Sequence, residues 1–324
     1  TAGRQSNLRA QLYSNFKHQL SLPQNDVSEV RSIVGSTPLA MTMEDIKGRA
    51  LMKRDEVDVI QLALPVAGAN DAQVLNNLRQ EVASLQEAWT GHRPSAIPMV
   101  PEELTEADFY GRASVQTAYE QGLVPLGLDL ETVEPVSWKP CGGNLLYLTE
   151  KESQMAAFAR LLSRGKQKTI ILAPQYNEIE SDENVLVVNN PDEYEELIAV
   201  ISQKIDERMK AKNFDHVATL VLYNLTELIE KMSQETRDNL AYILNKGERG
   251  GYASIVMTVP SLNRQIDPVS AVAKSFKKAI MAVRITDQTV VAVNNKPLRE
   301  QLLEEQTHYY VQNTIANKIK VLMY

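Results

Sequence analysis

The chain has 324 residues, a net charge of −7 and a hydrophobic fraction of 44%. Its length predicts more than one domain, and its apolar content is sufficient for a large core. The acidic balance argues against a nucleic-acid partner, because binding to phosphates requires a basic face. A single cysteine, Cys141, excludes an internal disulfide and fits a reducing compartment. No apolar run approaches the ~20 residues that span a bilayer.

The first part of the chain is rich in short strand-like runs up to about residue 66, and a helix is predicted over residues 71–89. Its apolar side chains share one stripe, formed by Leu75, Leu78, Val82, Leu85 and Trp89. The next segment, GHRPSAIPMVPEEL, contains three prolines that prevent a helix. We expect this segment to be a linker that buries Ile97, Met99 and Val100. The chain opens on TAGRQSN without an initiator methionine, which suggests a fragment of a longer protein whose membrane anchor, if any, lies outside it.

Strands and helices alternate from about residue 120. The predicted strands are compact apolar runs: GNLLYL, KTIILAP, NVLVV, HVATLVLY and YASIVMT. The helix over 152–163 carries Met155 and Phe158 on one face, and two further helices are predicted to begin after Asn190 and Ser233. Short apolar strands that alternate with helices predict an α/β fold with a mostly parallel sheet covered by helices on both faces.

An internal repeat relates the two ends of the chain. NFKHQLSL (15–22) is similar to SFKKAIMA (275–282), and VDVIQLAL (57–64) is similar to NKIKVLMY (317–324). Both pairs share an offset of 260 residues, which short chance matches would rarely do. The repeat predicts that the chain begins in the last third of one domain and ends with the last third of a second, similar domain.

Four stretches carry a family resemblance: SNFKHQLSL, SEVRSIVGSTPLAMTMEDIKGRALMKRDEVDVIQLALPV, IPMVPEEL and VPLGLDLETVEPV. They resemble the FtsK/SpoIIIE family of P-loop motor ATPases, and within it the coupling ATPases of Gram-positive type VII secretion. The resemblance implies a RecA-like P-loop NTPase fold. It places 1–66 at the end of a preceding ATPase domain, 67–119 in a linker helix and proline-rich connection, and 120–324 in a third, degenerate ATPase domain.

The phosphate-binding loop of this family has the pattern G-x-x-x-x-G-K-[ST]. Its glycines let backbone N–H groups reach phosphate, its lysine neutralises charge, and its hydroxyl holds magnesium. In register, Thr149, Gln154, Met155 and Ala156 occupy those four positions. All four are substituted, so we expect an ordinary strand–helix turn with Met155 packed in the core rather than a phosphate site.

The second catalytic position of the family is a pair of acids at the end of the Walker B strand. Tyr223 and Asn224 stand there, and neither supplies a carboxylate. Glu227 follows three residues later and is expected to be a solvated or capping side chain. Thr258 matches the threonine that ends the family's next strand, although a threonine in that place is common.

The resemblance therefore implies a domain that has lost ATP hydrolysis, with no cofactor in this fragment and with ATP and Mg²⁺ confined to other domains of the parent protein. Its implied partners are secreted WXG100-type proteins and the other ATPase domains of the same chain, at the cytoplasmic face of the membrane of a Gram-positive bacterium. A hexameric assembly of the parent stays open. The alternatives are an active P-loop motor that holds ATP in an unconventional loop, and a DNA translocase, which the acidic charge disfavours.

Overall fold

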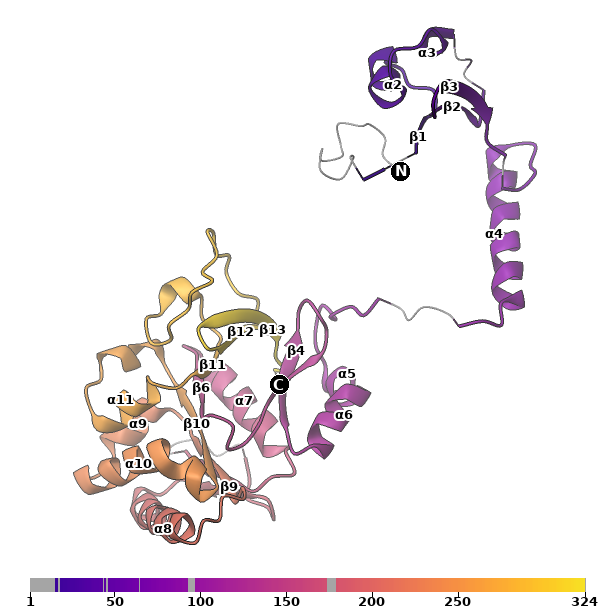
Figure 1. Cartoon of the computed structure of the whole chain (residues 1–324). Helices are drawn as coiled ribbons and strands as arrows, with labels where there is room; N and C mark the ends of the chain where they lie inside the picture. Colours follow the sequence, from indigo (N-terminus) through magenta and orange to yellow (C-terminus); the bar gives the residue numbers. More distant parts are fainter. Residues whose placement is uncertain are drawn as a thin grey trace. The chain divides into compact units, whose positions relative to one another are not determined.

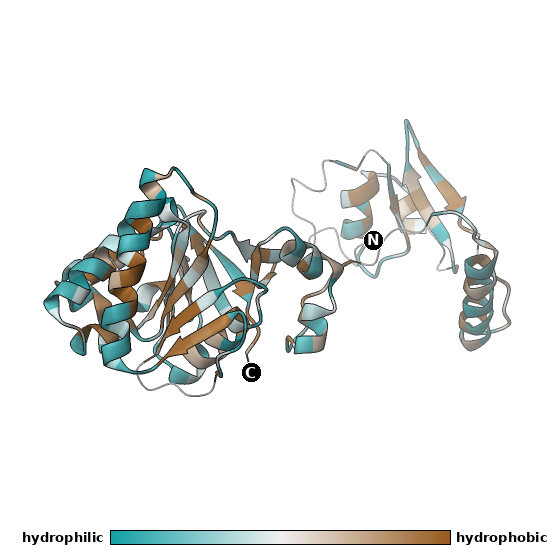
Figure 2. Ribbon diagram, turned by 90° about the horizontal axis from the view of Figure 1, so that it is seen from below, coloured by the Kyte–Doolittle hydropathy of each residue, from teal (hydrophilic) through white to brown (hydrophobic). Residues whose placement is uncertain are grey.

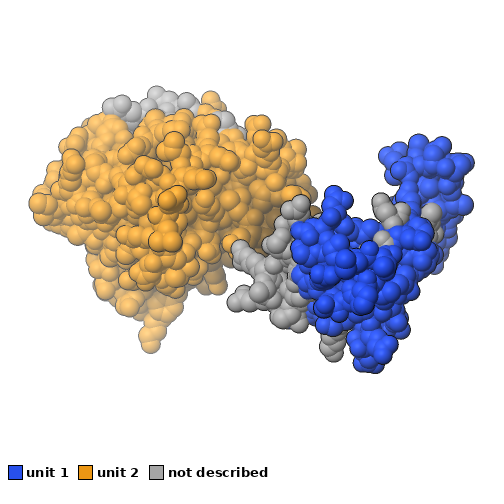
Figure 3. Space-filling model, turned by 90° about the horizontal axis from the view of Figure 1, so that it is seen from above, with its two compact units in different colours: residues 1–95 blue, residues 96–324 orange. Residues whose placement is uncertain are grey.

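The computed structural model describes residues 15–16, 18–42, 44, 46–63, 65–92, 97–173 and 179–323. The chain divides into two compact units, Thr1–Ser95 and Ala96–Tyr324, which Figure 3 distinguishes by colour. The elements of both units are labelled in Figure 1.

The first unit contains a small antiparallel sheet in the order β1-β2-β3. Its elements are β1 Gln19–Ser21, α2 Val27–Val34, α3 Leu39–Thr42, β2 Arg49–Lys53, β3 Val57–Gln61 and α4 Asp71–Ala88. Asp26 caps α2, because its carboxylate accepts the Ser28 N–H at 2.8 Å. Val30 and Val34 of α2 pack with Ala40 and Leu51 of β2 in a small apolar core.

The second unit contains a sheet of ten strands. The strands are β4 Val124–Asp129, β5 Pro135–Trp138, β6 Leu145–Leu148, β7 Thr169–Leu172, β8 Val185–Val188, β9 Ala218–Leu222, β10 Tyr252–Thr258, β11 Lys278–Met281, β12 Thr307–Gln312 and β13 Ile315–Lys320. The α-helices are α5 Glu106–Tyr110, α6 Ala113–Glu120, α7 Glu152–Ser163, α8 Pro191–Lys210, α9 Leu225–Glu230, α10 Gln234–Lys246 and α11 Pro268–Ala273. Three 3₁₀ turns follow at η2 Gly247–Gly250, η3 Pro260–Arg264 and η4 Ile285–Asp287.

The strand order is β5-β4-β13-β12-β11-β6-β10-β9-β7-β8. The strands from β11 to β8 pair in parallel, and the strands from β12 to β5 pair antiparallel along one side. In the parallel part, β10 lies between the predicted P-loop strand β6 and the predicted Walker B strand β9. The predicted mostly parallel α/β sheet is confirmed.

Helices cover both faces of this sheet, as predicted (Figure 1). On one face, Phe158 of α7 stacks on Tyr147 of β6 with ring centroids 4.2 Å apart. On the other face, Ile198 and Ile201 of α8 and Leu240 of α10 are buried in a second core. Figure 2 shows the resulting pattern, with hydrophobic residues along the strands and hydrophilic residues on the outer sides of the helices. Asn190 and Ser233 cap α8 and α10 as the sequence predicts.

The compact second unit begins earlier than the boundary at residue 120 that the family resemblance implies. Leu104, Phe109 and Val115 are fully buried in the same core as α7. Residues 104–119 therefore pack as part of the second unit and not as a free connection, because their apolar side chains cover the α7 side of the sheet.

The apolar side chains of the helix and linker before this point are exposed. Among the described residues of α4 none is buried, and Leu85 and Trp89 are 62% and 59% exposed. The expectation that Ile97 and Met99 are buried is wrong, because they are 84% and 76% exposed. The core of the second unit begins at Leu104, and the described residues 97–103 form no helix or strand that would turn these side chains inward.

The three strands of the first unit have the same order and relative directions as β11, β12 and β13 of the second. Leu20 of β1 and Ile280 of β11 are related by the offset of 260 residues. Ile280 is fully buried because β11 also pairs with β6, whereas Leu20 is 44% exposed. Among the described residues, the outer edge of β1 has no strand beside it. The assignment of residues 1–66 to a preceding ATPase domain stays a prediction.

We expect this open edge to lower the local stability of the first unit. Amides of β1–β3 should exchange with deuterium far faster than those of β6, β9 and β10, because fewer apolar contacts oppose their opening. Hydrogen exchange followed by mass spectrometry measures both sets in one sample. The edge strand β8 of the large sheet is the control for edge position alone, and equal protection in β1–β3 and β10 would contradict the prediction.

Candidate functional site

The turn between β6 and α7 is closed by its own hydrogen bonds. Thr149 is fully buried, and its backbone N–H donates to the Thr258 carbonyl at 3.1 Å. Its hydroxyl donates to Oε1 of Gln154 at 2.5 Å and accepts the Lys151 N–H at 3.1 Å. The Thr149 hydroxyl and the Gln154 side chain thus bond to groups of the protein, where a working phosphate-binding loop has glycines and a lysine that face a ligand.

The three substituted residues at the start of α7 all point into the core. Gln154 is 4% exposed, Met155 is 1% exposed and Ala156 is 9% exposed. Met155 and Ala156 belong to the same apolar cluster as Tyr147 and Phe158. The prediction that Met155 is a core residue is confirmed, because a flexible apolar side chain fills the space that a lysine would leave polar.

The two Walker B positions are also tied to neighbouring side chains. Tyr223 is 3% exposed, and its hydroxyl donates to the carboxylate of Glu152 in the first turn of α7. Asn224 has a left-handed backbone with φ of 51°, and its amide donates to Glu227 at 3.3 Å. Glu227 also pairs with Lys231 at 2.9 Å, so it is a locally bound side chain, as expected.

Glu152 is the residue of this site that sequence reasoning missed. The amino end of a helix favours negative charge, and in a working phosphate loop the ligand supplies it. Here Glu152 is an acidic residue in that turn, and its hydrogen bond with Tyr223 joins the two positions at which the family's catalytic groups are replaced. The contact spans 71 residues of sequence, so no local pattern could have predicted it.

Thr258 lies at the carboxyl end of β10, next to the same turn. It is fully buried, and its hydroxyl lies 3.4 Å from that of Thr226. The structure thus brings all seven predicted positions to one end of the sheet, where open α/β folds place ligands. Within the described ranges, no cluster of three or more His, Cys, Asp or Glu side chains is arranged to hold a metal ion.

A buried polar network continues from the site to residues 304–308, which lead into the carboxyl-terminal hairpin of β12 and β13. The Gln154 amide donates to the Glu305 carbonyl at 3.2 Å. The Tyr147 hydroxyl donates to the Gln154 carbonyl and lies 3.1 Å from Nε2 of His308, which is fully buried. Burial lowers the pKa of His308 to about 4, so this histidine is neutral at physiological pH.

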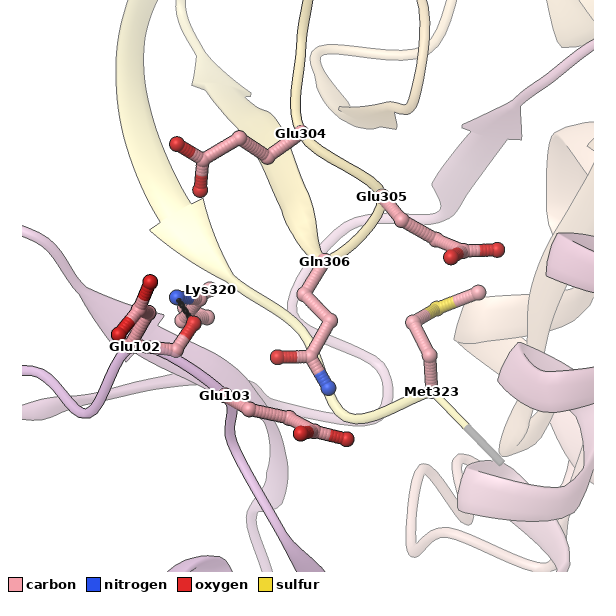
Figure 4. A pocket seen from close by; sticks show the side chains of 7 residues that line it. All are labelled: Glu102, Glu103, Glu304, Glu305, Gln306, Lys320 and Met323. Atoms are coloured by element: carbon pink, nitrogen blue, oxygen red, sulfur yellow. Dashed lines mark hydrogen bonds between the residues drawn. The ribbon is translucent and has the colours of Figure 1, made fainter.

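A cavity of about 380 Å³ adjoins this network (Figure 4). Its lining residues are Glu102, Glu103, Glu304, Glu305, Gln306, Lys320 and Met323. Lys320 is 5% exposed, and its ammonium donates to the carbonyls of Pro101, at 2.9 Å, and of Glu102. The cavity therefore presents carboxylates, and its lysine is already used by the backbone.

Comparison with known proteins identifies relatives across nearly the whole chain. No family model matches the chain. The chain is 26% identical over 351 residues to the ESX secretion system protein EccC of Geobacillus thermodenitrificans, and 22% identical over 334 residues to the type VII secretion system protein EssC of Staphylococcus aureus. Each alignment covers 99% of this chain. The chain is thus similar, over nearly its whole length, to type VII (ESX) secretion system proteins. It spans only 23% and 22% of the length of these two relatives.

Solved structures show the same fold. EssC (ATPases 2 and 3) from Geobacillus thermodenitrificans superposes with a TM-score of 0.79 at 23% identity, over 99% of this chain and 63% of that chain. EccC (ATPases 2 and 3) from Thermomonospora curvata, in complex with a signal sequence peptide, gives a TM-score of 0.59 at 16% identity, over 98% of this chain and 60% of that chain. The RecA-like fold implied by the sequence is thereby confirmed. Among the helices of the described residues, none is both long and apolar enough to cross a membrane.

The filled site leads to a prediction about Met155. Met155→Lys places an unpaired charge among buried apolar groups and should lower the free energy of unfolding by about 3 kcal/mol or more. It should not create ATPase activity, because the glycines and both acids are still missing. Urea unfolding measures the change. Met99→Lys makes the same substitution at an exposed methionine and should change stability by less than about 0.5 kcal/mol. Equal stability of the two variants would show that Met155 is not in a closed core.

The buried neutral His308 predicts a specific dependence of stability on pH. Its pKa is about 4 when folded, below the ordinary 6.5, so between these values the unfolded chain binds the proton more readily. Stability is unaffected above pH 6.5 and is lost as pH falls toward 4. Between pH 7.5 and pH 5 the wild type should lose about 2 kcal/mol more than His308→Gln. Other titrating groups are common to both proteins and cancel in this difference. Parallel pH curves from urea titrations would contradict the prediction.

Proposed function

We propose that this chain is a nucleotide-independent part of a type VII secretion ATPase, which binds secreted substrates and regulates the ATPase domains of the same protein. The observation that carries the proposal is the filling of the phosphate position by Gln154 and Met155, both almost wholly buried. A nucleotide would have to displace these side chains from a packed core, and it would meet neither a loop lysine nor a Walker B acid.

The charge around the site supports the same reading. Glu152 is in the first turn of α7, and four glutamates line the adjoining cavity. A triphosphate carries several negative charges, so its approach to these carboxylates is unfavourable. The alternative of a working motor would need a cation here, but the one ammonium of that lining, on Lys320, is held by two backbone carbonyls.

The binding half of the proposal rests on the relatives. A similar fold in EccC was solved in complex with a signal sequence peptide. We extend this property to the present chain, with secreted WXG100-type proteins as the substrate class and the cytoplasmic face of a membrane as the location. The seven degenerate positions have no catalytic role in this proposal and serve the packing of the domain.

We expect no thermal stabilisation by Mg-ATP. A ligand present at ~100 times its dissociation constant stabilises a protein by about 2.7 kcal/mol, which for a domain of this size raises the melting temperature by roughly 5–10 °C. Differential scanning fluorimetry with millimolar Mg-ATP should show no such rise. An intact P-loop ATPase in the same buffer is the control for the ligand, and a reproducible rise for this chain would favour the active-motor alternative.

The same instrument tests substrate binding with a signal sequence peptide of a secreted WXG100-type protein. A concentration-dependent rise with this peptide, and none with a scrambled peptide of the same composition, is the expected result. If neither Mg-ATP nor any signal peptide changes the melting temperature, the substrate-binding half of the proposal is wrong while the loss of nucleotide binding stands.

A further inference from the structure

Residues 101–104 are held by two side chains. One is Gln306, which directly precedes β12, and the other is Lys320 at the end of β13. The Gln306 amide accepts the Leu104 N–H at 2.7 Å and donates to the Leu104 carbonyl at 3.0 Å, so it pairs with the backbone as a neighbouring strand would. Lys320 donates to the carbonyls of Pro101 and Glu102. Figure 4 shows Gln306 and Lys320 extending from the hairpin toward the chain at Glu102 and Glu103.

Glu305, the residue before Gln306, is bound by a side chain of the predicted phosphate-loop turn. The Gln154 amide, at a former glycine position of the phosphate loop, donates to the carbonyl of Glu305. Gln154 in turn is fixed by the Thr149 hydroxyl, and the Gln306 carbonyl lies 3.2 Å from Nδ1 of His308. Residues 304–306 are therefore held between the first turn of α7 and segment 101–104.

This chain of contacts is mostly closed to water. Thr149, Gln154, His308 and Lys320 are each 5% exposed or less. Polar groups at such depth depend on their partners, because each lost hydrogen bond leaves a buried group without replacement by solvent. A movement of residues 304–306 would break contacts on both sides at once.

We propose that the lost nucleotide site has become a latch for the segment that joins the two units. Gln154 binds residues 304–306, and these residues bind segment 101–104. Segment 101–104 is therefore docked only while the first turn of α7 holds residues 304–306, and the two contacts are made or broken together. Release would add the four residues 101–104 to the connection that follows α4. At ~3.4 Å per extended residue this adds about 14 Å of reach. The inference goes beyond the proposed function, since it requires neither nucleotide nor substrate.

The test is hydrogen exchange on the full chain with variants at the two ends of the latch. Gln154→Met keeps the length of the side chain but removes its amide, and the Gln154 side chain forms no described hydrogen bond with segment 101–104. Exchange of the Leu104 amide should nevertheless accelerate roughly two- to tenfold, the equivalent of one net hydrogen bond. Reciprocally, Gln306→Ala should accelerate exchange of the Gln154 and Met155 amides, because coupling between two sites is mutual.

The matched control is Gln167→Ala, which removes another bond from a side-chain amide to a backbone carbonyl, that of Gly122, in the same unit. It should leave segment 101–104 and α7 unchanged. The amides of β9 report global unfolding, and they should exchange as in the wild type in every variant.

A double-mutant cycle decides between a latch and two separate contacts. In the double variant Gln154→Met/Gln306→Ala, the opening free energies derived from exchange should be non-additive if the two residues act through one moving segment. Additive effects, or a Gln154→Met variant with wild-type exchange at Leu104, would overturn the proposal. Gln154→Met could accelerate exchange of the β9 amides as much as that of the Leu104 amide, which would mean that it destabilises the whole unit. The Gln306→Ala variant then decides, through exchange of the Gln154 and Met155 amides of α7.

Discussion

The burial of the first turn of α7 is the constraint on which the site depends. A phosphate loop keeps this turn open, so that backbone N–H groups face a ligand. In this protein Met155 packs with Tyr147 and Phe158 in one apolar cluster, and the turn is closed. Once it is closed, every polar atom left inside must find a partner in the chain, because an unpaired buried group is costly. The hydrogen bonds of Thr149 and Gln154 follow from this requirement.

The amino end of α7 carries a negative charge that belongs to the protein itself. The amino end of a helix favours an anion, and a nucleotide would normally supply one. Glu152 places an acidic side chain in that turn, and Tyr223 binds it from the former Walker B position. The two replaced positions thus hold each other in place. The two predicted substitutions are therefore structurally linked, because the Tyr223 hydroxyl binds the Glu152 carboxylate.

Local sequence patterns predicted much of the secondary structure and part of the site. The remaining features depend on contacts between residues that are distant in the sequence. The strands, the caps at Asn190 and Ser233 and the burial of Met155 follow from periodicity and from register with a known motif. The hydrogen bonds between Gln306 and Leu104 join residues 202 positions apart, and no local pattern in either segment predicts them. Burial of Ile97 and Met99 was expected from their apolar character alone. That expectation was wrong because an apolar side chain is buried only where the fold provides a surface for it to pack against.

The same three-stranded arrangement occurs in two environments within this chain, and the contrast shows what its stability requires. In the second unit, β11 pairs with β6, and Ile280 is fully buried. In the first unit the equivalent Leu20 remains 44% exposed. A small sheet is stable only when enough apolar surface is buried against a neighbouring element to offset the entropy of ordering. The strand β6 and the helix α7 therefore have a structural role in the second unit that is independent of phosphate chemistry. That role gives a physical reason why a strand and helix of this kind would be kept in a domain that binds no nucleotide, as we propose for this one.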